Sequence, residues 1–214
     1  MNPNPARTLS SLSRWMAAAL LALPLLTLAA DETPDVLVKN LSTEVLDAIR
    51  TDKDIQKGNT HHMIEMVDAK ILPHVNFQRT TALAVGKGWR QATPEQQKQL
   101  TEEFRKLLVF TYAGALQQIK DQKVQLKPFR ADPADTDVVV RTQIVGSRGE
   151  PIQLDYRVEK TDAGWKIYDV NVLGAWLVEN YKTQFASEIN QNGVAGLIKK
   201  LTEMNASLDK AAQK

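Results

Sequence analysis

The segment IQLDYRVE, residues 152–159, alternates apolar and polar side chains without interruption. This period of two predicts a β-strand with one apolar face and one solvated face. Three further strands are predicted, by alternation or by a high content of β-branched residues, over residues 124–127, 138–145 and 165–172. Compact turns at residues 146–149 and 161–164 join the last three strands, so the four strands are expected to form an antiparallel meander.

Helical spacing of apolar residues precedes the strands. Thr33 offers a capping hydroxyl before Pro34, and Thr93 with Gln96 forms a capping box before a long apolar stripe. The predicted helices cover residues 34–51, the segment from Asn59 or Thr60 to Pro73, the segment from Asn76 to Gly86, and residues 94–120.

Helical spacing returns after the strands, at Leu177, Tyr181, Phe185 and Ile189. Gly193 is predicted to end or kink this helix, and a last helix follows with Val194, Leu197, Ile198, Leu201 and Met204. Residues 206–214 form a polar tail that is expected to be frayed. Helices, then strands, then helices predict an α+β fold, with a twisted antiparallel four-stranded sheet and helices packed on one face of it.

Residues 1–30 have the pattern of a signal peptide. Arg7 and Arg14 provide the positive start, an apolar run covers residues 15–28, and cleavage is expected after Ala29 or Ala30. The run of about 14 residues is shorter than the roughly 20 that a membrane-spanning helix needs. We therefore expect export through the Sec pathway to the periplasm, and a soluble domain over residues 31–205.

Composition excludes several classes of function. The 214 residues contain no cysteine, which rules out disulfides, thiolate metal sites and cysteine nucleophiles. Without the two arginines of the signal peptide, the chain has 25 basic and 25 acidic residues. A neutral chain has no general attraction for the phosphates of nucleic acids, so no nucleic-acid partner is expected.

Few residue patterns suggest catalysis. His61 and Glu65 are four residues apart on a predicted helix, but two ligands do not make a zinc site, and neither HExxH nor GxSxG occurs. Asp155 and Asp169 could form an acid pair on neighbouring strands, although strand parity predicts a solvated position for Asp155. We therefore predict neither a metal site nor a catalytic residue. The apolar helix stripes can either fill a core or line a cleft, and composition does not decide between the two.

A long series of residues in the second half of the chain resembles the MlaC family, also called toluene-tolerance auxiliary proteins. The series contains GWKIYDVNV at residues 164–172, LGAWLV at 173–178 and NYKTQF at 180–185. Earlier segments agree, namely HVNF at residues 74–77 and GWRQAT at 88–93. One departure is Asn76, where the family more often has aspartate.

The resemblance implies a non-enzymatic phospholipid carrier in the periplasm. Such a carrier shuttles lipid between an outer-membrane lipoprotein–porin complex and an inner-membrane ABC transporter with an MCE-domain subunit, and so maintains lipid asymmetry of the outer membrane. The resemblance also implies a cone-shaped monomer that docks transiently on its membrane partners and binds phospholipid as cargo, with no cofactor. The acyl chains are expected between the sheet and the helices, and the head group near solvent.

Resemblance and strand parity together give a set of expected lipid-lining residues. Nine lie on predicted helices or their connections: Leu72, Val75, Phe77, Leu107, Leu108, Tyr112, Trp176, Leu177 and Tyr181. Seven lie on predicted strands: Val139, Ile144, Leu154, Tyr156, Tyr168, Val170 and Val172.

Two other functions are consistent with the same pattern of elements. The first is an enzyme on a cone-shaped α+β scaffold that acts on a small apolar substrate, with Asp155 or Asp169 as the base. It requires an inward-facing carboxylate with a raised pKa. The second is a structural adaptor without a ligand, which requires a filled core and no continuous apolar cavity.

Overall fold

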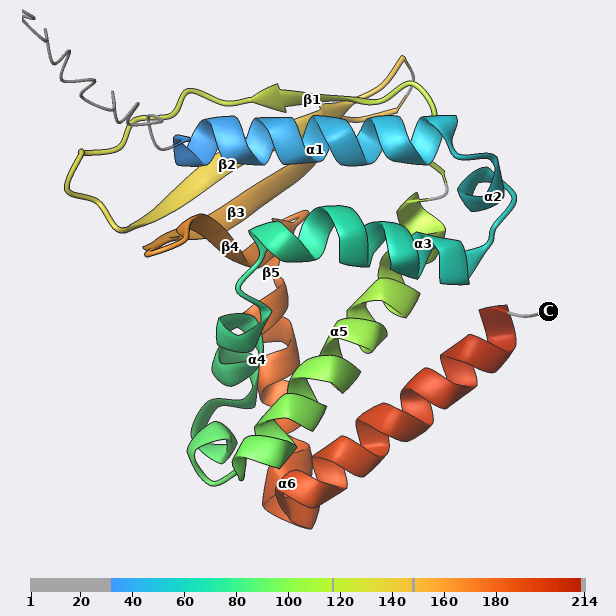
Figure 1. Ribbon diagram of the computed structural model, residues 1–214, viewed down its shortest axis with the longest axis vertical. Helices are drawn as coiled ribbons and strands as arrows, with labels where there is room; N and C mark the ends of the chain where they lie inside the picture. The colour runs from blue at the N-terminus through green and yellow to red at the C-terminus, as the bar shows by residue number, and fades with distance from the viewer. Residues whose placement is uncertain (1–31, 117, 148, 213–214) are drawn as a thin grey trace, which may run out of the picture. The chain divides into compact units, whose positions relative to one another are not determined.

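A computed structural model describes residues 32–116, 118–147 and 149–212. The predicted signal peptide at residues 1–30 lies outside the described residues. Along the chain, helices precede and follow an antiparallel sheet, which confirms the predicted α+β class (Figure 1). Among the described helices, none combines the length and the apolar character that crossing a membrane requires.

The sheet is a meander of five antiparallel strands in the order β1-β2-β3-β4-β5. The strands are β1 (Lys123–Leu126), β2 (Asp137–Val145), β3 (Ile152–Thr161), β4 (Gly164–Val172) and β5 (Ala175–Trp176). The prediction of four strands is therefore wrong by one. Strand β5 has only two residues, which pair with Asn171 and Val172 after a tight turn, and two residues are too few to show a periodicity.

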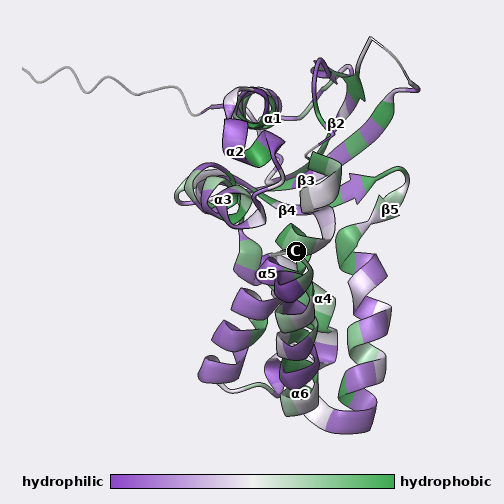
Figure 2. Cartoon of the chain, turned by 90° about the vertical axis from the view of Figure 1, so that its right-hand side faces the viewer, coloured by the Kyte–Doolittle hydropathy of each residue, from purple (hydrophilic) through white to green (hydrophobic). Residues whose placement is uncertain are grey.

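The register of the strands gives the sheet one apolar face. Val138 lies opposite Val158, and Val158 lies opposite Ile167, so these side chains meet on the same face. Helix α1 (Pro34–Thr51) covers this face with Leu37, Val38 and Leu41. Alternating hydrophobic and hydrophilic residues are visible along the long strands in Figure 2.

The remaining helices follow the predicted boundaries closely, with shorter pieces between them. They are α2 (Lys53–Gln56), α3 (Thr60–Met66), the π-helix η1 (Val67–Ile71), the 3₁₀ helices η2 (Leu72–His74) and η3 (Gly86–Arg90), α4 (Phe77–Val85), α5 (Pro94–Leu116) and α6 (Leu177–Ala212). The predicted second helix thus continues through α3 into η1 and η2, and α5 ends at Leu116 instead of residue 120.

The side-chain caps confirm most of the predicted helix starts. The Asn76 side chain accepts a hydrogen bond from the Arg79 backbone N–H at 3.1 Å. The Thr93 hydroxyl accepts one from the Gln96 N–H at 3.2 Å, and the Gln96 side chain accepts one from the Thr93 N–H at 3.0 Å, which completes a capping box. Thr33 is an exception, because its side chain makes no capping bond.

Helix α6 has two arms that meet at Gly193. The φ of this residue is 69°, in the left-handed region that glycine adopts at little cost, and the helix kinks there as predicted. The second arm returns along α5 (Figure 1), and the Asn205 side chain donates a hydrogen bond to the Glu103 carbonyl at 2.9 Å. The predicted frayed tail is helical as far as Ala212.

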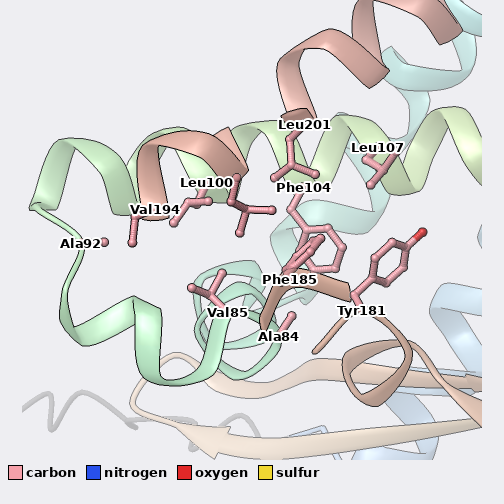
Figure 3. Close-up of a cluster of buried hydrophobic side chains, with 11 residues drawn as sticks. Ala84, Val85, Ala92, Leu100, Phe104, Leu107, Tyr181, Phe185, Val194 and Leu201 are labelled. Atoms are coloured by element: carbon pink, nitrogen blue, oxygen red, sulfur yellow. The ribbon is translucent and has the colours of Figure 1, made fainter. Parts of the chain in front are cut away.

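A dense aromatic cluster fills the space between α4, α5 and α6 (Figure 3). The Phe104 ring lies at its centre, with centroid distances of 5.8 Å to Phe77, 4.9 Å to Tyr181 and 5.0 Å to Phe185. A third apolar cluster joins α1 to α3 and η1 through Ile49 and Met63. The cluster under α1 joins that helix to the sheet, and the other two clusters join the helices to one another.

Candidate functional site

An apolar cavity of about 190 Å³ lies beside strand β4. The other walls come from η1, η2, α4, α5 and the first residue of α6. The lining residues are Val67, Ile71, Leu72, Val75, Phe77, Thr80, Arg105, Leu108, Val109, Tyr112, Leu116, Ile167, Tyr168, Asp169, Val170 and Leu177.

Helix α5 provides the longest wall of the cavity. Arg105, Leu108, Val109, Tyr112 and Leu116 all line it. Their spacings of three or four residues place them on one face of the helix. Burial raises the pKa of the Tyr112 hydroxyl, in agreement with a partly enclosed position.

Hydrogen bonds to backbone carbonyls of β4 come from Asn76, just before α4, and from Thr80 within α4. The Asn76 N–H donates to the Ile167 carbonyl at 2.8 Å, and the Thr80 hydroxyl donates to the Tyr168 carbonyl at 2.7 Å. Val75 also forms an isolated parallel bridge with Ile167. These bonds satisfy polar groups in the part of β4 that the two-residue strand β5 leaves unpaired.

A β-bulge at Tyr168 changes the direction of its side chain. The register with β3 skips this residue, because Asp169 pairs with Arg157 and Ile167 pairs with Val158. The Tyr168 hydroxyl donates to Asp137 at 2.8 Å, and the Arg79 guanidinium stacks on the Tyr168 ring at 3.7 Å. Burial and the hydrogen bond to Asp137 raise the pKa of Tyr168 to about 12.

The carboxylate of Asp169 is buried and fully engaged in hydrogen bonds. One oxygen accepts from the backbone N–H groups of Val170 and Val178 at 2.9 and 3.1 Å, and the other accepts from Arg157 at 3.0 Å. Burial raises the pKa of Asp169. The carboxylate therefore holds the start of α6 against β4.

The prediction of a solvated Asp155 is wrong, and Asp169 is buried as well. Asp155 and Asp169 are 6% and 2% exposed, because polar side chains and the start of α6 cover this side of the strands. Asp169 has the inward position and the raised pKa that the enzyme hypothesis requires. Its bonds to two backbone N–H groups and to Arg157 nevertheless occupy both of its oxygens, which is the arrangement of a helix cap instead of a free base.

Half of the sixteen expected lining residues lie on the cavity: Leu72, Val75, Phe77, Leu108, Tyr112, Tyr168, Val170 and Leu177. Leu107 and Tyr181 lie in the aromatic cluster instead, and Tyr156 packs with the cluster under α1. Val139, Ile144, Leu154, Val172 and Trp176 also lie outside the lining. Val139 is opposite Arg157, so it shares the polar face of the sheet.

Eight lining residues were not anticipated: Val67, Ile71, Thr80, Arg105, Val109, Leu116, Ile167 and Asp169. A signal for three of them was present in the sequence. Arg105, Val109 and Leu116 have the same helical spacing as Leu108 and Tyr112, and this stripe differs from the one that contains Phe104.

A second, open depression of about 630 Å³ lies between α1, α3 and η1, and carboxylates and His62 line it. The His62 ring contacts the carboxylates of Asp52 at 2.7 Å and Glu65 at 3.1 Å. His61 contacts Asp209 at 3.2 Å, so the structure does not bring His61 and Glu65 together as a ligand pair. No group of three or more potential metal ligands occurs in the described part of the chain.

The fold and the cavity define a class of α+β proteins that enclose an apolar pocket between one edge of an antiparallel sheet and a layer of helices. A model of the MlaC protein family matches residues 39–203. The chain therefore belongs to the MlaC family, which confirms the family predicted from the sequence.

Individual relatives agree with this assignment. Toluene tolerance protein ttg2D of Pseudomonas putida is 29% identical over 186 residues, 86% of each chain. The intermembrane phospholipid transport system binding protein MlaC of Haemophilus influenzae is 23% identical over 180 residues, 83% of this chain and 84% of its own. The solved structure of a phospholipid-binding protein from Ralstonia solanacearum, in complex with a phospholipid, is 49% identical, with a TM-score of 0.80 over 84% of this chain and 99% of its own.

Proposed function

We propose that this protein binds a phospholipid and holds the acyl chains in the cavity beside β4. The observation that carries the proposal is an almost entirely apolar lining, built by six elements, in a chain that is 49% identical to a protein in complex with a phospholipid. Each methylene group that leaves water contributes about 0.8 kcal/mol. Two chains with about fourteen buried methylenes each would contribute on the order of 20 kcal/mol before the costs of ordering and of opening the site.

Loading must enlarge the cavity. Its volume of about 190 Å³ is below the roughly 300–1,000 Å³ of most ligand pockets, and a phospholipid with two chains needs at least such a pocket. The wall formed by η1 and η2 is the part we expect to move. It consists of one π-helical turn and one 3₁₀ turn, which hold their shape less firmly than a regular α-helix.

We further propose that the protein carries its lipid across the periplasm. The donor and the acceptor would be the outer-membrane lipoprotein–porin complex and the MCE-domain subunit of the inner-membrane ABC transporter. The signal-peptide pattern of residues 1–30 supports export, and the names of the relatives support transport between membranes. An exposed acyl chain in water would lose the energy of burial, so transfer requires direct docking on each partner.

The cavity also bears on the adaptor hypothesis. A structural adaptor without a ligand requires a filled core, whereas the described residues leave an apolar volume beside β4 that no side chain fills. An apolar cavity that nothing fills lowers the stability of the fold. An apolar ligand can occupy such a cavity and remove this cost. This observation favours the carrier over the adaptor.

The direct test is mass spectrometry of protein purified from cells without detergent. We expect a co-purified phospholipid, and we expect delipidated protein to take up phospholipid from liposomes. Absence of lipid in both experiments would contradict the proposal.

A pair of matched variants tests the location of the acyl chains. Leu108→Glu places a charge in the cavity wall, and Leu83→Glu makes the same change at a site on α4 that is outside the cavity and 38% exposed. We expect Leu108→Glu to lower lipid uptake at least tenfold, because a buried carboxylate opposes apolar contact. We expect Leu83→Glu to bind lipid as the wild type does. Equal uptake by both variants would place the acyl chains elsewhere.

A further inference from the structure

Two charged side chains line the otherwise apolar cavity: Asp169, which holds the start of α6, and Arg105, whose presence acyl chains do not explain. Among the described residues that line the cavity, Arg105 is the only lysine or arginine. Its side chain is 22% exposed: the stem lines the cavity, and the guanidinium, paired with the exposed Asp68, adds almost no polar surface to the lining. A charged group beside an apolar cavity is costly unless it has a partner.

The position of Arg105 on α5 matches the polarity of a phospholipid. Arg105 is the first cavity residue of the helix, and Leu108, Val109, Tyr112 and Leu116 follow on the same face. From residue 105 to residue 116 the helix rises about 16 Å. The wall therefore has a cation at one end and an apolar surface along the rest, as an anionic head group followed by an acyl chain requires.

The present partner of Arg105 is an exposed carboxylate that another anion can replace. Its guanidinium is paired with the carboxylate of Asp68, on η1, and Asp68 is 42% exposed. Ion pairs with this degree of exposure contribute little to stability, about 0–1 kcal/mol. Asp68 therefore supplies a negative charge when the cavity is empty and can give way to another anion at small cost.

Other cations near the cavity are already committed to the fold. Lys70 pairs with Glu44 of α1 at 2.6 Å, and it does not line the cavity. Arg79 pairs with Glu159 and Asp137 and stacks on the Tyr168 ring, also outside the lining. Arg105 combines a cavity position with a single exposed partner, and neither of the other two cations does.

We propose that Arg105 binds the phosphate of the cargo lipid, and that the phosphate replaces Asp68 as its partner. This inference rests on the proposed function and adds a contact that selects for phosphate. The planar guanidinium donates two parallel N–H bonds to phosphate oxygens, a geometry that an ammonium group cannot reproduce. The exchange also removes the ion pair between η1 and α5, on the side where the cavity must widen for the acyl chains.

The experiment uses three variants of the full mature protein and vesicles that contain equal amounts of phosphatidylglycerol and diacylglycerol. Arg105→Met removes the charge and retains much of the apolar stem, Arg105→Lys retains the charge without the fork, and Asp68→Asn breaks the same ion pair but leaves the arginine. Bound lipid is measured by mass spectrometry after gel filtration. Thermal unfolding of each variant shows that it is folded.

We expect Arg105→Met to lower the uptake of phosphatidylglycerol about tenfold and to leave that of diacylglycerol unchanged. Arg105→Lys should be intermediate, and Asp68→Asn should take up phosphatidylglycerol at least as well as the wild type. Two results would overturn the inference and show that the ion pair has only a structural role. The first is an equal loss of phosphatidylglycerol and diacylglycerol uptake in Arg105→Met. The second is a loss of phosphatidylglycerol uptake in Asp68→Asn as large as that in Arg105→Met.

Two further measurements distinguish this inference from the binding of free phosphate and from a failure of the proposed function. Inorganic phosphate at millimolar concentration should not reduce the uptake of phosphatidylglycerol by the wild type. If it does so in the wild type but not in Arg105→Met, the residue binds free phosphate and the lipid assignment is wrong. If the wild type takes up neither lipid, the proposed function fails, whereas unchanged uptake by Arg105→Met in a protein that loads lipid overturns only the role of Arg105.

Discussion

Helix α5 has two apolar faces, one that packs into the protein core and one that lines the cavity. Leu100, Phe104 and Leu107 are at most 2% exposed and pack into the aromatic cluster with α4 and α6. Leu108 and Tyr112 lie on the adjacent face, are half-buried and line the cavity. The residues on the two faces are of the same chemical kinds, so what lies opposite each face decides between core and cavity.

The elements opposite the two faces differ in regularity. The two arms of α6, joined at Gly193, and α4 bring long side chains such as Phe185 and Leu201 against the first face. The second face meets η1, η2 and the bulged part of β4, whose geometry does not allow regular packing. Regular helices fill space efficiently, whereas these irregular segments leave a volume that a ligand can use.

The largest expected effect is on the filled face. We predict that Phe104→Ala lowers the free energy of unfolding by about 3–5 kcal/mol, because Phe104 is fully buried and contacts three other aromatic rings. Urea denaturation followed by circular dichroism measures this loss. The exposed residue Leu83 provides the control, since Leu83→Ala should change the free energy of unfolding by less than about 1 kcal/mol. A loss below that level for Phe104→Ala would mean that the first face is not the core.

Most of the fold could be predicted because its signals are local. The capping asparagine Asn76, the capping box of Thr93 and Gln96, and the alternation of residues 152–159 each determine a helix start or a strand without reference to the rest of the chain. The two-residue strand β5 gave no such signal, because its pairing depends on the turn that precedes it.

The site was harder to predict because it depends on tertiary structure. Strand parity assigned Leu154 to the lining, but the cavity lies beside the part of β4 that β5 leaves unpaired, and parity does not give the order of the strands. The bulge that redirects Tyr168 has no marker in the sequence. Asp155 was expected in solvent because strand parity puts it on the polar face, and the burial of that position is known only from the fold.

Two adjacent leucines sharpen the comparison of the two faces. We predict that Leu107→Ala costs about 2–4 kcal/mol of unfolding free energy, since Leu107 is 2% exposed, and that Leu108→Ala costs about 1 kcal/mol in delipidated protein, since one side of Leu108 already borders open volume. Urea denaturation of the two delipidated variants measures both. Equal costs would show that the two positions are packed alike and that the cavity closes in solution.

The smallest expected effect concerns the support of the cavity wall. His62 lies on α3, which continues into η1, and its ring contacts Asp52 and Glu65. The hydrogen bonds to Asp52 and then to Glu65 raise the pKa of His62 from 6.5. The folded protein therefore binds the proton more tightly than the unfolded chain does. This contribution to stability is complete below about pH 6.5 and is lost as the pH rises through the raised pKa.

We therefore predict that the wild type has a slightly higher Tm at about pH 6 than at about pH 8, relative to His62→Gln, which cannot titrate in this range. Hydrogen exchange should locate the difference in α3 and η1 and leave the amide exchange of Phe104 and Leu107 unchanged, because the partners of His62 are Asp52 and Glu65, which lie outside the aromatic cluster. A change in the amide exchange of α4, α5 and α6 together with that of η1 would contradict this prediction. The aromatic cluster and the cavity wall would then unfold as one cooperative unit, and lipid loading would have to disturb the core as well as the wall.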